Sequence, residues 1–159
     1  GYYSKQPFFN AVYPNNASLV GENLTNEKIT GLEAGYGFRS AIFNATLNLY
    51  YTTWKDRYQR TTDNATDNPG GYYDFSGITE VHSGVELEAN ARVTDKFKVN
   101  GMVSIGNWVY DGNSKSNRYD FENNPISGGT ATTLYLDKVK VGDAAQLTAS
   151  IGASYEVLW

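Results

Sequence analysis

The sequence contains no cysteine and only one histidine, His82, among its 159 residues. A disulfide framework and a thiolate metal site are therefore impossible, and His82 has no second histidine with which to hold a transition metal. We expect His82 to be an exposed residue at the start of a strand. The composition predicts no cofactor and no metal site.

Long hydrophobic runs and clusters of basic residues are also missing. No segment approaches the roughly 18 to 20 apolar residues that a transmembrane helix needs. The formal net charge is −4 and the lysines and arginines are scattered, whereas nucleic-acid binding calls for a basic stripe. These absences argue against a helical membrane protein and against a nucleic acid partner.

The sequence is instead rich in aromatic residues, including 13 tyrosines, and in strict alternation of apolar and polar residues. The alternation occupies five segments: residues 28–38, 41–54, 81–93, 97–110 and 147–157. The clearest segment places an apolar stripe, Val85, Leu87, Ala89, Ala91 and Val93, opposite the polar residues Glu86, Glu88, Asn90 and Arg92. Period-two alternation predicts antiparallel strands with one apolar and one polar face.

The phase of the alternation agrees with the expected hairpin turns. A turn of residues 94–96 pairs Val93 with Phe97, so that apolar residues share one face of the sheet. A turn at residues 39–40 pairs Tyr36 with Phe43, and its even length accounts for the change from even to odd apolar positions. The two phase relations support two hairpins.

Short turns alternate with long connections along the chain. This pattern is typical of an outer-membrane barrel, in which short turns are periplasmic and long loops are extracellular. It predicts an all-β fold, an antiparallel up-and-down transmembrane β-barrel segment of about five strands within a larger barrel. The expected organisation is a loop at 1–27, a hairpin at 28–54, a loop at 55–77, a hairpin at 78–110, a loop at 111–144 and a strand at 145–159.

The aromatic residues fall into two groups at the ends of these strands. Tyr36, Phe43, Phe97, Tyr155 and Trp159 lie toward the short turns. The group toward the long loops is Tyr50, Tyr51, Trp54, Trp108 and Tyr110. Two belts of this kind are expected at the two membrane interfaces, although tyrosine and phenylalanine favour strands in general.

Five stretches, taken in order, resemble the barrel of TonB-dependent receptors from Bacteroidetes: Asn26–Phe38, Asn48–Arg57, His82–Glu88, Gly101–Tyr110 and Thr133–Gln146. The resemblance implies a barrel of about 22 strands in the bacterial outer membrane, plugged from within. It also implies import of a scarce ligand (a siderophore, glycan, peptide or cobalamin) with energy relayed by the TonB complex. The implied partners are outer-membrane lipid, the plug, the remaining strands, TonB and the small extracellular ligand.

We find no plug domain and no TonB-contact segment in the sequence, and we expect the chain to be an internal stretch of a longer protein. Its start, Gly1–Lys5, has neither an initiating methionine nor the layout of a signal peptide. Five strands also leave two open edges, and unpaired backbone groups in hydrocarbon cost several kcal/mol each.

The candidate ligand contacts are Trp54, Arg57, Tyr58, Tyr72 and Tyr73, which lie in or beside the first long loop between strands. Aromatic residues and arginine supply most binding hot spots, so these side chains are expected to contact a ligand. Ordinary anchoring at the membrane interface is the competing interpretation of the same residues.

Acidic residues suggest no catalytic or cation site, and we expect no enzyme activity. Asp63, Asp67 and Asp74 fail the spacing of a calcium loop and are better read as turn formers. Glu86 and Glu88 share a face, but nothing in the sequence provides an environment that separates their pKa values for catalysis. In a barrel they are expected to hydrate the lumen or to contact the plug.

One alternative is an autotransporter or adhesin barrel, which shares the lipid face but not the family motifs. Another alternative to a receptor barrel is a soluble β-sandwich carbohydrate-binding module. The two differ in what the apolar stripe faces, because a sandwich buries it against a second sheet and a barrel exposes it to lipid. Small residues such as Ala45, Ala89, Gly101 and Ala153 would give a sandwich only a thin core. The barrel interpretation predicts that Ala89 faces lipid and Glu88 faces the lumen.

Overall fold

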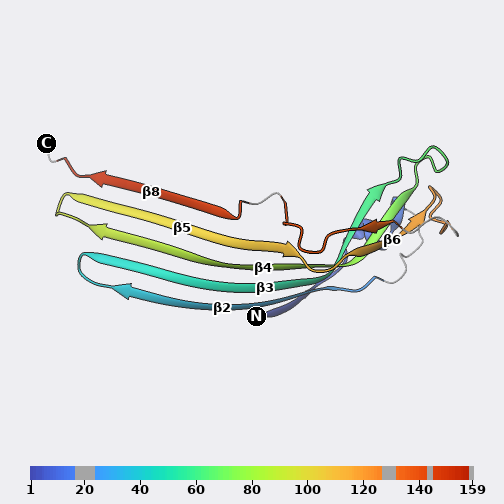
Figure 1. The fold of residues 1–159 in the computed structure, drawn as a ribbon. Helices are drawn as coiled ribbons and strands as arrows, with labels where there is room; N and C mark the ends of the chain where they lie inside the picture. The colour runs from blue at the N-terminus through green and yellow to red at the C-terminus, as the bar shows by residue number, and fades with distance from the viewer. Residues whose placement is uncertain (17–23, 127–131, 143–144, 158–159) are drawn as a thin grey trace. The chain divides into compact units, whose positions relative to one another are not determined.

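The computed structural model of the chain describes residues 1–16, 24–126, 132–142 and 145–157. The chain is all-β, with antiparallel strands in one sheet, as the alternation predicts (Figure 1). Within the described ranges, no helix has both the length and the apolar character needed to cross a membrane. The elements are β1 (Tyr2–Lys5), α1 (Phe9–Val12), the 3-10 turn η1 (Pro14–Asn16), β2 (Glu27–Arg39), β3 (Phe43–Thr62), β4 (Tyr72–Arg92), β5 (Phe97–Tyr110), β6 (Ser114–Tyr119), β7 (Thr133–Leu134) and β8 (Leu147–Tyr155).

The strands follow the order β1-β2-β3-β4-β5-β8, and β6 pairs with β4 and β7 away from this path. The chain divides into two compact units. Unit 1 comprises residues 1–30, 53–80 and 109–139, and unit 2 comprises residues 31–52, 81–108 and 140–159. The long strands β2 to β5 contribute residues to both units, and each unit is described by itself.

Unit 2 is a sheet whose two faces follow the alternation of the sequence. The pairing of β5 with β8 shows this directly, since it sets Val103 opposite Ala149 and Ser104 opposite Thr148. Apolar residues or glycine therefore meet on one face, and the other face is polar apart from Met102 and Gly152. The strand segments lie side by side in Figure 1.

No described residue of unit 2 is buried. Large apolar side chains on one face of its strands are highly exposed: the exposed fraction is 86% for Ile151, 70% for Leu32 and 68% for Leu147. An apolar surface of this extent is typical of a face that contacts lipid or another protein. Unit 2 thus has a stripe but no core of its own.

The turn between β4 and β5 lies where the sequence predicts it. The Val93 amide donates to the Phe97 carbonyl at 2.9 Å, and the Thr94 hydroxyl accepts from the Phe97 amide at 3.0 Å. The threonine side chain thereby closes the tight turn of residues 94–96.

The predicted pairing of β2 with β3 is wrong in register. The Ser40 amide donates to the Phe43 carbonyl at 2.7 Å, so the turn lies beyond residues 39–40. A Cβ on Gly35 would meet the Asn48 side chain, whereas the predicted register sets Gly35 opposite Asn44. The difference is four residues, an even number, so each side chain keeps the face that the alternation gives it.

In unit 1 the strands run further than the alternation predicts. β3 continues to Thr62 and β4 begins at Tyr72, within the segment 55–77 that we expected to be a loop. β6 lies within the expected loop 111–144 and pairs with the start of β4, with Tyr72 opposite Tyr119 and Phe75 opposite Ser116.

Two residues with left-handed backbone interrupt the alternation, and for this reason the alternation does not predict these extensions. They are Asp56 (φ 60°) in β3 and Gly77 (φ 71°) in β4. The Trp54 indole donates to Glu27 at 2.8 Å, whereas Asp56 accepts from Lys28 at 2.8 Å. Glu27 and Lys28 are neighbours in β2 and face opposite sides of the sheet, so their partners Trp54 and Asp56 also face opposite sides. Residues two apart in a regular strand would share a face.

The buried residues of the described chain all lie in unit 1. The apolar side chains are Ala11, Ile29, Tyr72, Phe75 and Ile78, and the polar ones are Glu27, Asp63, Asn68, Glu80, Ser114 and Ser116. Pro14 and Gly71 are buried as well. Buried polar groups need hydrogen-bond partners. The core of unit 1 is therefore organised by ion pairs and hydrogen bonds as much as by apolar contact.

Candidate ligand-binding site

A chain of charged and aromatic side chains runs across β1 to β4 in unit 1. Lys5 donates to Glu27 at 3.2 Å, and the Trp54 indole donates to the same carboxylate oxygen at 2.8 Å. The Arg57 guanidinium lies 4.3 Å from the centre of the Trp54 ring and is paired with Glu80. Stacking on the indole and pairing with a carboxylate fix the orientation of Arg57.

Glu80 is almost completely buried, with an exposed fraction of 1%. A buried carboxylate is costly unless it is paired and hydrogen-bonded, and Arg57 provides that partner. The Nε of Arg57 is itself buried and has no hydrogen-bond partner among the described residues. The guanidinium therefore retains an unused donor in a place that water reaches poorly.

A small cavity lies beside this ion pair. Its volume is 130 Å³, and it is lined by Arg57, Tyr58, Gln59, Ile78, Glu80 and Tyr110. The lining residues include one basic and one acidic residue, one glutamine, two tyrosines and one isoleucine. Concave sites that mix apolar walls with a few polar groups are the usual form of a ligand site.

Tyr58 is held at the cavity by a second ion pair. Its hydroxyl donates to Asp74 Oδ1 at 2.5 Å, and Arg60 donates to both oxygens of Asp74, at 2.7 and 2.9 Å. Burial, together with the neighbouring carboxylate, raises the pKa of Tyr58 well above its usual range. The phenol therefore stays protonated, and its hydroxyl donates to Asp74.

Tyr72 and Tyr73 have structural surroundings. Tyr72 is 4% exposed, its ring stacks on Tyr119 at 5.2 Å, and its hydroxyl donates to Asn123 at 3.0 Å. Burial raises the pKa of Tyr72 to about 12. Tyr73 is half-buried, with the Arg118 guanidinium 5.9 Å from its ring centre.

The structure thus separates the five predicted ligand contacts. Arg57 and Tyr58 line the cavity, and Trp54 supports Arg57 from outside it. Tyr72 packs in the core of unit 1 instead. The cavity also contains Gln59, Ile78, Glu80 and Tyr110, which sequence reasoning missed. Their gathering depends on β3 and β4, which continue beyond the predicted strand ends.

The aspartates that we weighed as calcium ligands are bound to arginines. Arg118 donates to Asp63 at 2.6 Å and to Asp67 at 2.9 Å, and Arg60 holds Asp74. Asp63 also accepts from the Ala65 amide at 3.0 Å, which confirms its turn-forming role. Among the described residues, no group of three or more His, Cys, Asp or Glu side chains is arranged to hold a metal ion.

Hydrogen bonds keep two of these carboxylates ionised. The Asn68 amide, followed by the Ala65 amide and Arg118, holds the pKa of Asp63 below its usual range against the effect of burial. The hydrogen bond from Arg118 lowers the pKa of Asp67. Asn68 also donates to the Tyr119 carbonyl at 3.0 Å, so this cluster fastens the loop between β3 and β4 to β6.

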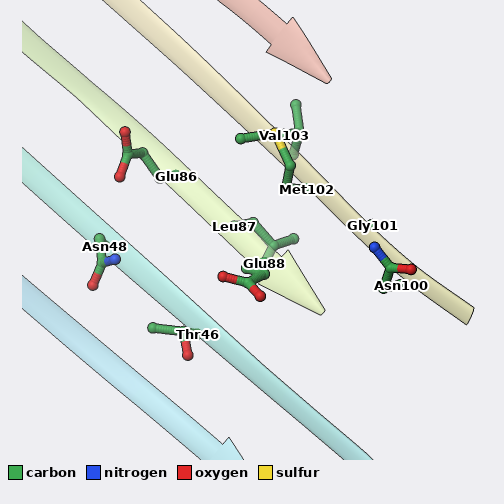
Figure 2. A pocket seen from close by; sticks show the side chains of 9 residues that line it. All are labelled: Thr46, Asn48, Glu86, Leu87, Glu88, Asn100, Gly101, Met102 and Val103. Atoms are coloured by element: carbon green, nitrogen blue, oxygen red, sulfur yellow. The ribbon is translucent and has the colours of Figure 1, made fainter. Parts of the chain in front are cut away.

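The polar face of unit 2 carries a pocket of 260 Å³ over β3 to β5 (Figure 2). Its polar lining comprises Thr46, Asn48, Glu86, Glu88 and Asn100. Hydrogen bonds connect the strands here. Ser104 donates to Glu86 at 3.5 Å, and Asn90 donates to Glu88 at 3.3 Å and to Asn44 at 3.1 Å. Glu86 thus accepts from the neighbouring strand β5, whereas Glu88 accepts from Asn90 of its own strand.

An aromatic cluster occupies the same polar face. The Trp108 indole donates to the Tyr50 hydroxyl at 2.9 Å, and His82 stacks on Trp108 at 5.3 Å. Gly84 and Gly106 make room for it, because a Cβ at Gly84 would lie 2.4 Å from the Tyr50 hydroxyl oxygen. The sequence signal for the cluster is two glycines and two large aromatics at even positions of neighbouring strands.

The cluster corrects two expectations. His82 lies within β4 and is half-buried, not exposed at a strand start, because Trp108 covers its ring. Tyr50 and Trp108 point to the polar face and do not belong to a belt on the apolar face. Tyr36, Tyr51 and Tyr155 are exposed as a belt requires, while Trp159 lies outside the described residues.

A two-faced antiparallel sheet is consistent with a fragment of a β-barrel, and comparison with known families agrees. The whole chain, residues 1–159, matches the family described as TonB dependent receptor-like, beta-barrel. The chain belongs to this family, which is one of receptors and transporters and not of enzymes. No curated protein and no solved structure matches the chain significantly.

Proposed function

We propose that this chain forms part of the barrel of an outer-membrane receptor, which binds a scarce nutrient outside the cell and imports it with energy relayed by TonB. The observation that carries the proposal is the apolar stripe of unit 2, exposed on one face of a sheet whose other face is polar. Lipid on one side and a hydrated lumen on the other account for both faces.

The proposed topology places the strands of unit 2 in the membrane. The short turns after β2 and β4 are periplasmic, and the segments 1–27, 55–77 and 111–144 are extracellular. Glu88 lines the polar pocket shown in Figure 2 and faces the lumen, whereas Ala89, its neighbour in β4, faces lipid.

The proposed partners follow from the edges of the sheet. β8 stands at one end of the strand order, and unpaired backbone groups in hydrocarbon cost several kcal/mol each. Further strands of the same receptor close the barrel, about 22 in all as in large transporters. We assign the receptor to the type found in Bacteroidetes, with a plug and TonB as partners and a siderophore, glycan, peptide or cobalamin as the nutrient.

The proposed ligand contacts lie in unit 1. Arg57 and Tyr58 line the cavity and are oriented by Trp54 and by Asp74, respectively. Tyr73 remains a candidate at the periphery, and Tyr72 acts by holding β4 against β6. Preorganised aromatic and arginine side chains are the usual anchors of a binding site.

The soluble β-sandwich module is the weaker explanation. It needs a second sheet packed on the apolar stripe, but the described strands of unit 2 belong to one sheet and Ile151 is 86% exposed. A receptor barrel accounts for this exposure without any further layer of protein.

Cysteine labelling of intact cells tests the topology, since the sequence supplies no cysteine of its own. Glu122→Cys, after β6, is expected to react with a membrane-impermeant maleimide on whole cells. The matched variant Asp95→Cys, an exposed site in the turn between β4 and β5, is expected to react only after the outer membrane is opened. The reverse pattern would overturn the topology, and labelling of neither site in membranes would overturn the outer-membrane assignment.

A further inference from the structure

Residues 8–16, which include α1 and η1, form a short strap on unit 1. α1 is a single turn of four residues, and no side chain caps its N-terminus. A helix this short is not stable by itself, because nucleation of the first turn is unfavourable. The strap therefore depends on its contacts with the rest of unit 1 for its structure.

Few polar contacts hold the strap in place. Three hydrogen bonds join it to the rest of the described chain. Arg60 Nη1 donates to the Asn10 carbonyl at 3.3 Å, and the Asn15 side-chain amide donates to the Phe121 carbonyl at 3.2 Å and to Asn123 Oδ1 at 3.3 Å. All three bonds are long and lie at exposed positions, where water competes for the same groups.

The strap also buries little apolar surface. Ala11 is 1% exposed and Pro14 is buried, whereas the large side chains Phe8 and Phe9 are mostly exposed. Hydrophobic stabilisation grows with the apolar area removed from water, so two small side chains contribute only weakly.

The loop of residues 63–71 is fastened more firmly within the same unit. Arg118 pairs with Asp63 at 2.6 Å and with Asp67 at 2.9 Å, and Asn68 donates to Asp63 at 2.8 Å. Hydrogen bonds to ionised groups are shorter and stronger than bonds between neutral groups. Segments with few buried contacts and exposed hydrogen bonds open at a lower cost in free energy. The strap is therefore expected to open while this loop stays closed.

The strap occupies one nitrogen of the Arg60 guanidinium. Nε and Nη2 of Arg60 donate to the two oxygens of Asp74, and Nη1 donates to the Asn10 carbonyl of the strap. The guanidinium lies 3.9 Å from the ring centre of Tyr72 and 5.8 Å from that of Tyr58. When the strap opens, Nη1 loses the Asn10 carbonyl and becomes available to another oxygen acceptor.

We propose that the strap opens locally while the rest of unit 1 stays folded, and that its opening frees Arg60 Nη1 for an oxygen acceptor on a ligand. The Asn10 carbonyl is then an autoinhibitory group that the ligand replaces. The inference rests on the proposed function, because it adds a means of regulation to the ligand contacts of unit 1. Tyr58, one of those contacts, lies beside Arg60.

Arginine modification of the whole receptor tests whether opening uncovers Arg60. Phenylglyoxal reacts with accessible guanidinium groups, and mass spectrometry of peptides measures the adducts at Arg60 and Arg118 separately. Arg118 is the internal control, since the two side chains are 17% and 13% exposed and both bind aspartate. Asn15→Ala removes two of the three hydrogen bonds of the strap. We expect it to raise the rate at Arg60 at least about threefold and to leave the rate at Arg118 unchanged.

Asn64→Ala is the matched control variant. Asn64 is exposed and forms no hydrogen bond with the strap in the described part of the chain, so we expect the rate at Arg60 to stay at the parent value. An unchanged rate at Arg60 in Asn15→Ala would overturn the inference. An equal rise at Arg60 and Arg118 would also overturn it, because unit 1 would then open as a whole.

Thiol labelling measures how often the strap opens when no ligand is present. In the whole receptor, Ala11→Cys is expected to react at least about tenfold faster than Ser116→Cys, a buried site in β6, and at least about tenfold slower than the exposed Glu122→Cys. A rate equal to that of Ser116→Cys would show that the strap opens only with the rest of unit 1. A rate equal to that of Glu122→Cys would show that the strap is not closed. Either result overturns the inference.

The strap and the receptor function can fail separately. Both measurements use the purified whole receptor in detergent and need neither a ligand nor an intact outer membrane. Negative results would overturn the strap and leave the receptor function standing. A reversed labelling pattern on intact cells would overturn the receptor topology and leave the strap standing.

Discussion

Units 1 and 2 are built from the same antiparallel strands, yet they bury their side chains in opposite ways. Every buried residue of the described chain belongs to unit 1, where Glu80, Asp63 and Glu27 lie inside with partners. In unit 2 the leucines and isoleucines of one face are exposed and no described residue is buried. Unit 1 carries its own core, whereas unit 2 needs surroundings that accept an apolar face.

The comparison shows that the alternation of apolar and polar residues in a strand is not enough to say whether its apolar face contacts water, lipid or protein. The burial of those residues must also be known. An exposed apolar stripe would be unfavourable in water and is favourable in lipid. Buried ion pairs are the reverse case, because their cost is offset only by close partners. Substitutions in the two units should therefore fail for different reasons.

The largest effect is expected at the buried ion pair of unit 1. Arg57→Met removes the guanidinium from a buried carboxylate, and loss of one partner of such a pair costs about 3 to 5 kcal/mol. Denaturant unfolding of the whole receptor in detergent, followed by a probe in unit 1, measures this change. The double variant Arg57→Met with Glu80→Leu is expected to recover most of the loss. A single variant as stable as the parent would show that the pair does not support unit 1.

The next effect tests the apolar face of unit 2. Ala89→Arg is expected to lower the free energy of unfolding in a lipid bilayer by about 2 to 4 kcal/mol if the residue lies near mid-membrane. Charge reversal of its neighbour, Glu88→Arg, is expected to cost much less because that side chain faces the polar pocket. Equal losses from the two variants would contradict the assignment of faces.

A smaller effect is expected at the glycines under the aromatic cluster. Gly84→Ala places a Cβ 2.4 Å from the Tyr50 hydroxyl oxygen and 2.7 Å from the Ile105 carbonyl oxygen. Overpacking of this kind costs about 1 to 3 kcal/mol. Gly37→Ala in β2 is the control, since a Cβ there meets nothing within 4 Å. Thermal unfolding in detergent compares the two, and an unaffected Gly84→Ala variant would show that Tyr50 moves aside freely.

The smallest effect is local and depends on pH. The pKa values of Asp63 and Asp67 are lowered by hydrogen bonds from Asn68 and Arg118, respectively. The stability that they provide is present above the unfolded pKa of about 3.9 and is lost as pH falls through the folded values. The hydrogen-exchange protection factors of residues 63–71, which are corrected for the intrinsic pH dependence of exchange, are expected to fall below about pH 4, while those of the strands of unit 2 are unchanged.

The control for the acid effect is Arg118→Met. This variant is expected to loosen the same loop at neutral pH, because Arg118 binds both carboxylates. The loop would then respond less to acid than in the parent. An equal acid-induced fall in the loop's protection factors in both proteins would assign the effect to other groups.

The sequence is most informative about the strands of unit 2. Alternation predicts their faces, and the turn of residues 94–96 lies where its parity places it. The β2–β3 register is wrong by four residues because alternation fixes only whether a shift is even or odd. The position of the turn sets which residues lie opposite each other. The backbone and side chain of Ser40 close this turn.

The candidate site could be predicted only in part. Arg57 and Tyr58 are identifiable by residue type and position, but the partners Glu80 and Asp74 are not, because they are 23 and 16 residues away in the sequence. Tyr72 is a candidate ligand contact by residue type and position, but in the structure it is buried and stacks on Tyr119 of β6. Long-range pairing decides which aromatic residues remain available.

Each of the left-handed residues Asp56 and Gly77 acts as one extra residue in its strand, as in a β-bulge. Beyond each of them the odd-numbered and even-numbered residues exchange faces of the sheet. Arg57 therefore lies on the same side as Trp54, and Asp74 contacts Tyr58. Two insertions, one in each of two paired strands, keep the partners in phase with each other. Two neighbouring strands can thus change which residues they present on each face without changing their pairing. A single deletion at either place would reverse the faces of the residues in one strand alone.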